Sequence, residues 1–317
     1  MDERVLRKAK ALRAGDRVAI VAPASPFPRD EFEAGVEEIR RLGFEPVFEP
    51  GVFDRRRYLA GEPLDRANAF LRAWADPAIA VVLTARGGFG SVQLLPFLDA
   101  AILRETPKLL VGYSDVTALL GFLTTRCGIT AVHGPTVAGR LGRGDAAYHR
   151  ASFLQALCAA EPAGELPAPG LEPLVAGEAS GQIYGGNLTQ LAASLGTPWA
   201  FDPPQGCVLF LEDVNERPYR LDRLLTQLEQ AGVLGRASAL VFGEMPGCDE
   251  ADGAITARAI CGEWARRVGR PAVWGLPSGH TAGAAISLPL GVRMRVAATE
   301  AAAVVIAEGS AVCRGTT

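Results

Sequence analysis

Short apolar runs alternate with helical patterns through the first half of the sequence, and this alternation limits the fold more than any other feature. The runs have the length of buried strands and lie at residues 16–21, 45–48, 79–84, 109–111 and 129–132. Between them, apolar residues recur three or four positions apart, which predicts amphipathic helices. Strands joined by crossover helices form parallel sheets covered on both faces. The first half therefore predicts a parallel, doubly wound α/β sheet.

The segment from Lys108 to Leu120, KLLVGYSDVTALL, combines an apolar strand with a helical pattern that begins just after a serine. A sharp strand-to-helix turn with serine at its tip is the layout of a nucleophile elbow, in which the hydroxyl projects above the sheet. The usual motif is G-x-S-x-G, whereas the fifth position here is Val116. On this segment alone, the alternative that Ser114 or Asp115 caps the helix ranks ahead of a catalytic role.

A glycine-rich loop, Arg86 to Ser91, follows the third predicted strand. It lacks the G-x-G-x-x-G spacing of a dinucleotide site, and the sequence has no Walker A motif. Two adjacent glycines let the backbone approach a neighbouring elbow, where Gly87 or Gly88 would offer an amide to an oxyanion. A turn without a ligand is an equally good interpretation of this loop by itself.

Prolines and glycines between Glu161 and Pro173 interrupt the pattern and mark a predicted domain boundary. We predict an N-terminal α/β domain over residues 1–160, a Pro-rich linker over 161–178 and a C-terminal domain over 179–317. In the C-terminal domain, strands and helices alternate up to Trp274, and short strands joined by turns follow. The predicted fold is therefore α/β, with an N-terminal parallel doubly wound sheet and a C-terminal β-rich α/β domain.

Composition argues against several classes of protein. The net charge is −3 with dispersed Lys and Arg, which disfavours binding to nucleic acid or an anionic membrane. No apolar run approaches the roughly 18 residues that span a bilayer. The first 17 residues carry charges throughout and lack an apolar core, which predicts no signal peptide. Six scattered cysteines without a C-x-x-C pair, and only three histidines, disfavour a metal centre and predict reduced thiols in the cytoplasm.

A nucleophilic serine requires a base and an orienting acid, and the base would be one of three histidines. His149 lies among charged residues and is interpreted as solvated surface. His133 follows the fifth predicted strand, where it could lie near the site. His280 lies in a Pro-Ser-Gly-His-Thr loop soon after a strand, and such loops often carry functional residues. A lone histidine in a loop is more often structural or merely exposed.

The acid would be one of three carboxylates that follow the apolar run at residues 207–211. Glu212 stands at the very end of the predicted strand, where its geometry would be fixed. Asp213 and Glu216 are looser alternatives in the loop. Without further context, a solvated loop carboxylate is the better interpretation of all three.

Taken together, five blocks of the sequence resemble the LD-carboxypeptidases. These are serine peptidases that trim murein tetrapeptides, and the family includes the microcin C7 self-immunity proteins. The blocks occur in the family's order and span nearly the whole chain, and GYSD, LED and GH in that order are far more specific than any single block. The Phe89 position is often Tyr in such proteins, which puts no catalytic residue in doubt. The blocks are ARGGFGS (Ala85–Ser91), GYSDVTALL (Gly112–Leu120), YGGNLTQLAASLGTPW (Tyr184–Trp199), LFLEDVNERPYRLDRLLTQL (Leu209–Leu228) and GLPSGHT (Gly275–Thr281).

The resemblance implies a catalytic triad of Ser114, Glu212 and His280 at the junction of two α/β domains, usually in a homodimer. Ser114 would attack an amide between an L-centre and a D-residue, with His280 as general base and Glu212 as its orienting acid. The backbone amides of Asp115 and Gly88 would form the oxyanion hole. No metal or other cofactor is expected.

A carboxypeptidase must also bind a free C-terminal carboxylate, and Arg86 beside the proposed oxyanion loop is a candidate. Two alternatives to murein recycling in the cytoplasm stay open. The first is an immunity-type amidase that uses the same triad on a peptidyl or aminoacyl nucleotide. The second is a non-catalytic α/β protein that binds a ligand and in which Ser114 caps a helix. A small L,D-peptide is the expected partner, with no nucleic acid and no membrane.

Overall fold

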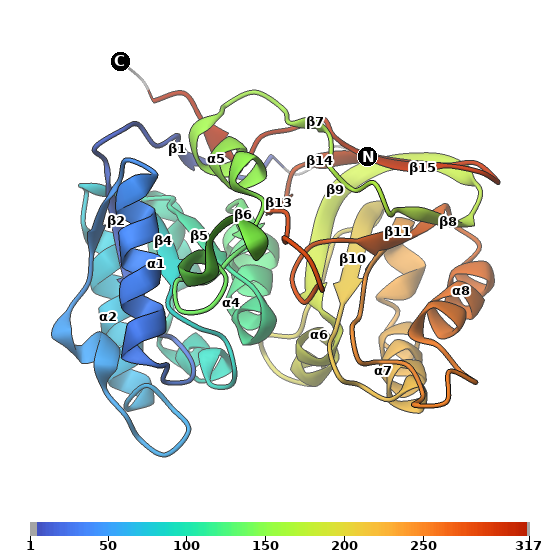
Figure 1. Cartoon of the computed structure of the whole chain (residues 1–317), viewed down its shortest axis with the longest axis horizontal. Helices are drawn as coiled ribbons and strands as arrows, with labels where there is room; N and C mark the ends of the chain where they lie inside the picture. Colours follow the sequence, from blue (N-terminus) through green and yellow to red (C-terminus); the bar gives the residue numbers. More distant parts are fainter. Residues whose placement is uncertain (1–4, 316–317) are drawn as a thin grey trace.

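The computed structural model describes residues 5–315, which form two large β-sheets with helices packed on both (Figure 1). A third, two-stranded sheet pairs β1 (Ala9–Lys10) with β16 (Val312–Cys313) in parallel, which joins segments near the two ends of the chain. Residues 1–4, the start of the segment that predicts no signal peptide, lie outside the described residues. Within the described residues, no helix combines the length and apolar character needed to cross a membrane.

The first sheet takes five parallel strands from the N-terminal half and one antiparallel strand from the C-terminal half. Residues of β2 alternate between two buried faces, with Val18 and Ile20 on one and Ala19 and Val21 on the other. Apolar residues on both faces require cover on both, so this sheet confirms the predicted parallel, doubly wound architecture. In spatial order, the strands are β3 (Glu45–Val47), β2 (Arg17–Val21), β4 (Ile79–Thr84), β5 (Leu109–Gly112), β6 (Ala131–His133) and β13 (Leu288–Leu290).

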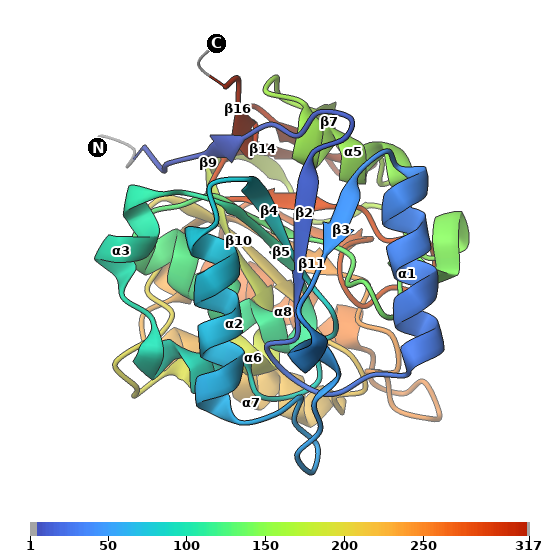
Figure 2. The same ribbon diagram turned by 90° about the vertical axis from the view of Figure 1, so that its left-hand side faces the viewer.

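Helices cover both faces of the first sheet (Figure 2). The helix α1 buries Phe32, Val36 and Ile39 at the predicted spacing, with acidic residues in its first turn and basic residues in its last turn. One face carries α1 (Arg29–Arg41) and α5 (Arg150–Cys158). The other face carries α2 (Pro63–Ala75), α3 (Ala100–Glu105) and α4 (Thr117–Gly121).

One predicted helix has a different form. The sequence predicts a helix through Leu94, Leu95 and Phe97, and the chain instead forms the 3₁₀ helix η2 (Ser91–Phe97). Pro96 lies inside this segment, and proline lacks the N–H that an α-helix needs. The other short helical segments are η1 (Pro50–Phe53), η3 (Ser114–Val116), the π-helix η4 (Phe122–Cys127), η5 (Leu141–Ala146) and η6 (Leu234–Arg236).

The second sheet has a parallel centre and antiparallel edges, which confirms a β-rich α/β fold in the C-terminal half. One face is covered by α6 (Leu188–Ser194), α7 (Pro218–Gln230) and α8 (Ala257–Val268). In spatial order, the strands are β7 (Gly164–Glu165), β15 (Ala303–Ala307), β14 (Arg293–Ala298), β9 (Gly177–Asn187), β10 (Cys207–Glu212), β11 (Ala237–Gly243), β12 (Ala272–Leu276) and β8 (Glu172–Val175).

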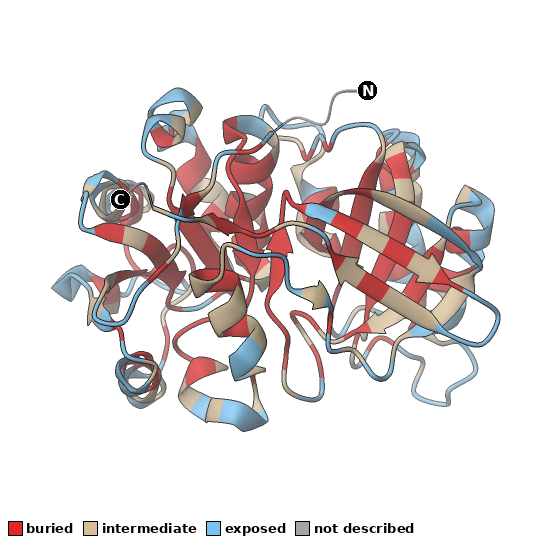
Figure 3. Ribbon diagram, turned by 90° about the horizontal axis from the view of Figure 1, so that it is seen from above, coloured by how far each residue is buried: buried red, intermediate tan, exposed pale blue. Residues whose placement is uncertain are grey.

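The two sheets share one hydrophobic core, and buried residues concentrate in the strands of both (Figure 3). The shared cluster runs from α2 and α4 to Ile183, Phe210 and Val241 on the second face of the second sheet. Residues 161–178, the predicted linker, contribute β7 and β8 to opposite edges of that sheet. The division into two domains with a linker stays a prediction.

Candidate active site

The chain turns sharply at Ser114, where β5 ends and η3 and then α4 begin. Ser114 has a φ of 64°, in the left-handed region that costs a non-glycine residue about 1–2 kcal/mol. Gly112 makes the turn possible, because a Cβ there would lie 2.4 Å from Oγ1 of Thr84 and 2.8 Å from Cγ1 of Val116. A strained serine on a strand-to-helix turn is the geometry of a nucleophile elbow.

Neither of the residues considered as helix caps has that role in the described structure. The two helical segments that follow the turn have no side-chain cap at their first residues. Asp115 is buried, and its Oδ2 accepts a hydrogen bond of 2.7 Å from the backbone amide of Ser91. Asp115 therefore ties the elbow to the glycine-rich loop, and the half-buried hydroxyl of Ser114 is not used for capping.

The glycine-rich loop packs directly against the elbow. A Cβ on Gly87 would lie 2.9 Å from Cβ of Ser114 and 3.2 Å from its Oγ, so only glycine fits without a shift. Gly88 has a φ of 102°, and a Cβ there would lie 2.5 Å from Oγ of Ser25. That hydroxyl also accepts a hydrogen bond of 3.1 Å from the amide of Phe89. The amide of Gly88 has no acceptor within residues 5–315.

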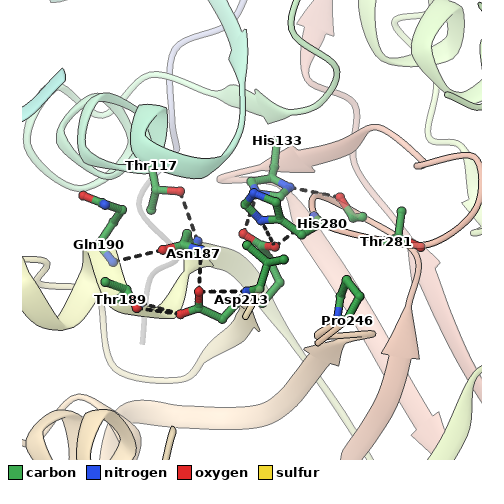
Figure 4. A network of polar contacts seen from close by, with 12 residues as sticks. Thr117, His133, Asn187, Thr189, Gln190, Asp213, Pro246, His280 and Thr281 are labelled. Atoms are coloured by element: carbon green, nitrogen blue, oxygen red, sulfur yellow. Dashed lines mark hydrogen bonds and ion pairs between the residues drawn. The ribbon is translucent and has the colours of Figure 1, made fainter. Parts of the chain in front are cut away.

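Glu212 and His280 form a buried hydrogen-bonded pair (Figure 4). Glu212 ends β10 with no exposed surface, and its Oε2 lies 2.8 Å from Nδ1 and 2.9 Å from the backbone N of His280. Burial by itself raises the pKa of the Glu212 carboxyl, but interactions with His133 and His280 outweigh burial and hold that pKa well below its usual range. The carboxyl is therefore ionised at neutral pH and accepts hydrogen bonds from the imidazole.

Ser114 and His280 line the same cavity, which has a volume of about 510 Å³. Three arginines line it as well, Arg86, Arg140 and Arg143, whereas Glu31 is the one carboxylate among the lining residues that the structure describes. The guanidinium groups of Arg86 and Arg143 are exposed and have no hydrogen-bond or ion-pair partner in the described part of the chain. The cavity therefore suits an anionic ligand.

Arg140 differs from the other two arginines because it holds the loop that carries His280. Its Nη2 donates to the carbonyl oxygen of Thr281 at 2.9 Å, and its Nη1 donates to that of Gly283 at 3.1 Å. Its guanidinium carbon also lies 5.7 Å from the centre of the Tyr113 ring, next to the elbow. Arg140 therefore connects the segment after β6 with the loop after β12.

The two other carboxylates considered from the sequence have different partners. Asp213 is buried and accepts hydrogen bonds from Nδ2 of Asn187 at 3.1 Å and from the backbone N of Thr189 at 2.9 Å, which holds the start of α6 (Figure 4). Burial and the neighbouring charge of Glu212 raise the pKa of Asp213. Glu216 pairs with Arg220 at the surface of α7.

The three histidines fall in three environments. The interpretation of His149 as solvated surface is wrong, because it is half-buried and its Nδ1 accepts a hydrogen bond of 3.1 Å from the amide of Ser152 at the start of α5. His133 does lie beside the Glu212–His280 pair. Among the described residues, no group of three or more His, Cys, Asp or Glu side chains is placed to hold a metal ion.

Arg140, Arg143 and Ser278 line or support the site but were not predicted from the sequence. Both arginines follow the β6 strand by a few residues, and a basic residue near the end of a parallel strand is the only local signal that could have drawn attention to them. Ser278 is buried and lies two residues before His280 in the same loop. Its contact with His133 depends on the packing of two sheets, which no local pattern records.

Comparisons with known proteins agree with this architecture. Residues 18–134 match the family model of the LD-carboxypeptidase N-terminal domain, and residues 180–296 match that of the LD-carboxypeptidase C-terminal domain. The murein tetrapeptide carboxypeptidase of Pseudomonas aeruginosa is 36% identical over 276 residues, which cover 84% of this chain and 88% of that protein. The microcin C7 self-immunity protein MccF of Escherichia coli is 27% identical over 320 aligned residues, which cover 91% of this chain and 92% of that protein.

A solved structure gives the same result for the fold. The crystal structure of muramoyltetrapeptide carboxypeptidase from Oxalobacter formigenes superposes with a TM-score of 0.81 at 29% identity, covering 92% of this chain and 99% of that one. Both halves match the family models in order, and a relative more than 30% identical aligns over most of both chains. This chain therefore belongs to the LD-carboxypeptidase family.

Proposed function

We propose that this protein is a serine-type LD-carboxypeptidase that removes the terminal D-Ala from murein tetrapeptides in cell-wall recycling. The observation that carries the proposal is the 2.8 Å hydrogen bond between Glu212 and Nδ1 of His280, beside a cavity that Ser114 also lines. The name of the relative that is 36% identical supports this choice of substrate.

In the proposed reaction, Oγ of Ser114 attacks the carbonyl carbon of the scissile amide while Nε2 of His280 takes the hydroxyl proton. An ionised Glu212 can only accept hydrogen bonds, so it keeps the resting proton of the imidazole on Nδ1. When the tetrahedral intermediate collapses, the C–N bond breaks and His280 gives its proton to the leaving amine of D-Ala. A water molecule then attacks the acyl-Ser114 ester while His280 takes its proton, the C–O bond to Oγ breaks as His280 returns that proton to Oγ, and the shortened peptide leaves.

The backbone amides of Asp115 and Gly88 would stabilise the oxyanion of the tetrahedral intermediate. The support is the close packing of the glycine-rich loop on Ser114 and the Gly88 amide, which lacks an acceptor in the described residues. Each donor of this kind lowers the barrier by about 3 kcal/mol in other hydrolases.

We also propose that Arg86 binds the free carboxylate of the substrate, because it is an exposed, unpaired guanidinium in the described structure and lines the cavity of Ser114. The Arg86→Ala variant should lose most of the preference for a free C-terminal carboxylate over the corresponding amide, measured as a ratio of kcat/KM values. The Arg143→Ala variant is the matched control. An unchanged ratio in Arg86→Ala with a lost preference in Arg143→Ala would assign the carboxylate to Arg143.

The second candidate function is that of an immunity-type amidase, which would use the same three residues on a peptidyl or aminoacyl nucleotide. The observation in its favour is the similarity to MccF along 91% of this chain. We rank it second because identity to the murein tetrapeptide carboxypeptidase is higher, at 36% against 27%. A third possibility, a protein that binds a ligand without catalysis, would leave the strained conformation of Ser114 without a use.

Mass spectrometry separates these candidates. Purified protein and a Ser114→Ala variant are each incubated with the tetrapeptide L-Ala-D-Glu-diaminopimelate-D-Ala and, separately, with an aminoacyl sulfamoyl adenosine. Loss of one D-Ala with the wild-type protein only is the expected result. Cleavage of the nucleotide substrate alone would select the immunity-type amidase, and cleavage of neither would favour a binding protein.

We further propose that the protein acts in the cytoplasm as a homodimer. Support for the location is that none of the six cysteines forms a disulfide in the described part of the chain, as expected of a reducing compartment. Light scattering coupled to size-exclusion chromatography measures the oligomeric state, and a mass of 33.3 kDa at micromolar concentration would contradict the dimer.

A further inference from the structure

A second histidine faces the carboxylate that holds His280. His133 ends β6 of the first sheet without exposed surface, and its Nε2 lies 3.8 Å from Oε1 of Glu212, slightly beyond hydrogen-bond length (Figure 4). Neither of these two buried atoms has a hydrogen-bond partner among residues 5–315. Buried polar atoms nearly always have a hydrogen-bond partner, so two atoms without one that lie opposite each other point to an interaction between the two side chains.

The His133 ring is fixed in this orientation on all sides. Its Nδ1 lies 3.0 Å from Oγ of Ser278, which is fully buried, and its ring centre lies 5.1 Å from that of Phe210. Gly279 has a φ of 82°, and a Cβ there would lie 2.5 Å from Cε1 of His133 and 2.8 Å from Cδ of Glu212. The imidazole therefore cannot rotate away from the carboxylate without displacing the loop that carries His280.

The hydrogen bonds around Glu212 assign the protons of both imidazoles. Oε2 already accepts from the backbone N and Nδ1 of His280, so Oε1 is the oxygen that lacks a donor. The hydroxyl of Ser278 can donate to Nδ1 of His133, which leaves the proton of a neutral His133 on Nε2. That N–H then lies on the nitrogen 3.8 Å from Oε1, where its dipole stabilises the negative charge of Glu212.

We propose that His133 is a positioning residue for the reaction proposed above. Anchored by Ser278, it holds Oε1 of Glu212 so that Oε2 stays aligned with Nδ1 of His280. The inference rests on the proposed function, because the alignment matters only if His280 is the general base. In this proposal the first sheet helps to position the Glu212–His280 pair of the second half of the chain, because His133 ends β6 and Glu212 ends β10.

Removal of the donor has a definite consequence for protonation. Without the Nε2–H dipole 3.8 Å from Oε1, the negative charge of the buried carboxylate loses a stabilising neighbour, so Glu212 binds protons more readily. The Glu212–His280 pair then keeps its inactivating proton up to a higher pH. Other charged or titratable groups near the pair stay in place in such variants, namely Tyr113, Arg140, Asp213 and Glu244. A changed pH profile would therefore be due to His133.

The test compares the wild type with His133→Leu, which removes the donor at similar size, and His133→Gln, which can place an amide N–H near the position of Nε2. Ser278→Ala removes only the anchor of the ring. Two rates are measured from pH 4 to 9 in all four proteins: hydrolysis of the tetrapeptide, and covalent labelling of Ser114 by a serine-directed fluorophosphonate. Labelling depends on the base but not on the natural substrate. Thermal unfolding reports whether each variant is folded.

We expect His133→Leu to lower kcat and the labelling rate about tenfold, with little change in KM, because the lost 3.8 Å contact between a dipole and a charge is weaker than a full hydrogen bond to a charged group. The pH at which the rates of His133→Leu fall off on the acidic side, the acidic limb of the pH–rate profile, should be higher than in the wild type. His133→Gln should recover most of the rate, and Ser278→Ala should move the limb in the same direction by less. A folded His133→Leu with an unchanged limb, or a His133→Gln no better than His133→Leu, would overturn the proposal.

Failure of the proposed function gives different results. If the wild type is labelled at Ser114 but leaves the tetrapeptide intact, the proposed substrate is wrong. The dependence of the labelling rate on pH still decides the role of His133. If the wild type is neither labelled nor active on any substrate, both proposals are overturned. Should His133→Leu fail to fold, unchanged acidic limbs in His133→Gln and Ser278→Ala would overturn the role of His133 alone.

Discussion

Gly87 lies where any side chain would meet the proposed nucleophile. Its backbone is not in the left-handed region, so the requirement for glycine comes from space and not from conformation. A Cβ at this position would be 2.9 Å from Cβ of Ser114, a contact that real structures essentially never show. In the proposed reaction, the strained conformation of Ser114 and the close packing of Gly87 would together restrict where the scissile carbonyl can lie.

Gly87→Ala should therefore reduce catalysis much more than stability. The added methyl group pushes the loop from the elbow and displaces the Gly88 amide, and a shift of about 1 Å in a reacting geometry costs on the order of 100-fold in rate. The measurement is kcat for the tetrapeptide together with the free energy of unfolding in urea. Gly235→Ala, where a Cβ meets no atom within 4 Å, is the control and should keep both values. A Gly87→Ala variant with the kcat of Gly235→Ala would contradict the prediction.

At the scale of elements, the loop after β12 is held from two sides. Arg140, which follows β6, binds the carbonyl oxygens of Thr281 and Gly283, and Glu244 after β11 accepts a hydrogen bond of 3.0 Å from the amide of Ala282. The loop has little apolar packing of its own around these residues, and Ala282 and Gly283 are exposed. Its order, and so the position of His280, depends on these polar contacts.

Arg140→Met should loosen this loop while leaving the sheets intact. Hydrogen–deuterium exchange of the loop peptide should become faster, and kcat should fall by at least about tenfold, because both hydrogen bonds from the charged guanidinium to the carbonyl oxygens of Thr281 and Gly283 are lost. Arg143→Met is the matched control, because its guanidinium lines the same cavity without a partner in the described structure. Equal exchange in the two variants would show that Arg140 does not hold the loop.

The elements show what could be predicted from the sequence and what could not. The five parallel strands follow local periodicity, and the sheet they form is confirmed. The helix predicted around Leu95 is a 3₁₀ helix because a single proline outweighs the apolar spacing. The strand β13 pairs with β6 from far along the chain, as in Leu288 opposite His133, and a local pattern carries no signal for such a partner.

The candidate site divides in the same way. The resemblance to a family pointed to Glu212 and His280, and the structure brings them into hydrogen-bond contact, while their catalytic roles stay proposals. The contact of His133 with the same carboxylate could not be predicted from the sequence, because it depends on how two sheets pack and not on the spacing of residues. A buried histidine at the end of a strand looks the same in sequence whatever lies opposite it.

At the scale of the whole molecule, the two halves are joined by more than the chain between them. One core cluster contains residues of both sheets, β13 completes the first sheet from the C-terminal half, and β1 pairs with β16 near the two ends. Neither half can therefore unfold without exposing apolar surface of the other, although the family models match the two halves separately. Because exposing that apolar surface to water is unfavourable, a state in which only one half is folded should be sparsely populated.

We therefore expect one cooperative unfolding transition. Two single-tryptophan variants, which keep either Trp74 of α2 or Trp264 of α8, should report the same midpoint in urea. Leu288→Ala removes a fully buried side chain from β13 and should lower the free energy of unfolding by about 2–5 kcal/mol, with an equal shift at both probes. Ile255→Ala, at a position that is 47% exposed, should change it by less than about 0.5 kcal/mol. If Leu288→Ala shifted the Trp74 transition alone, the halves would be independent units, and the alignment of Glu212 by His133 would depend on how they dock.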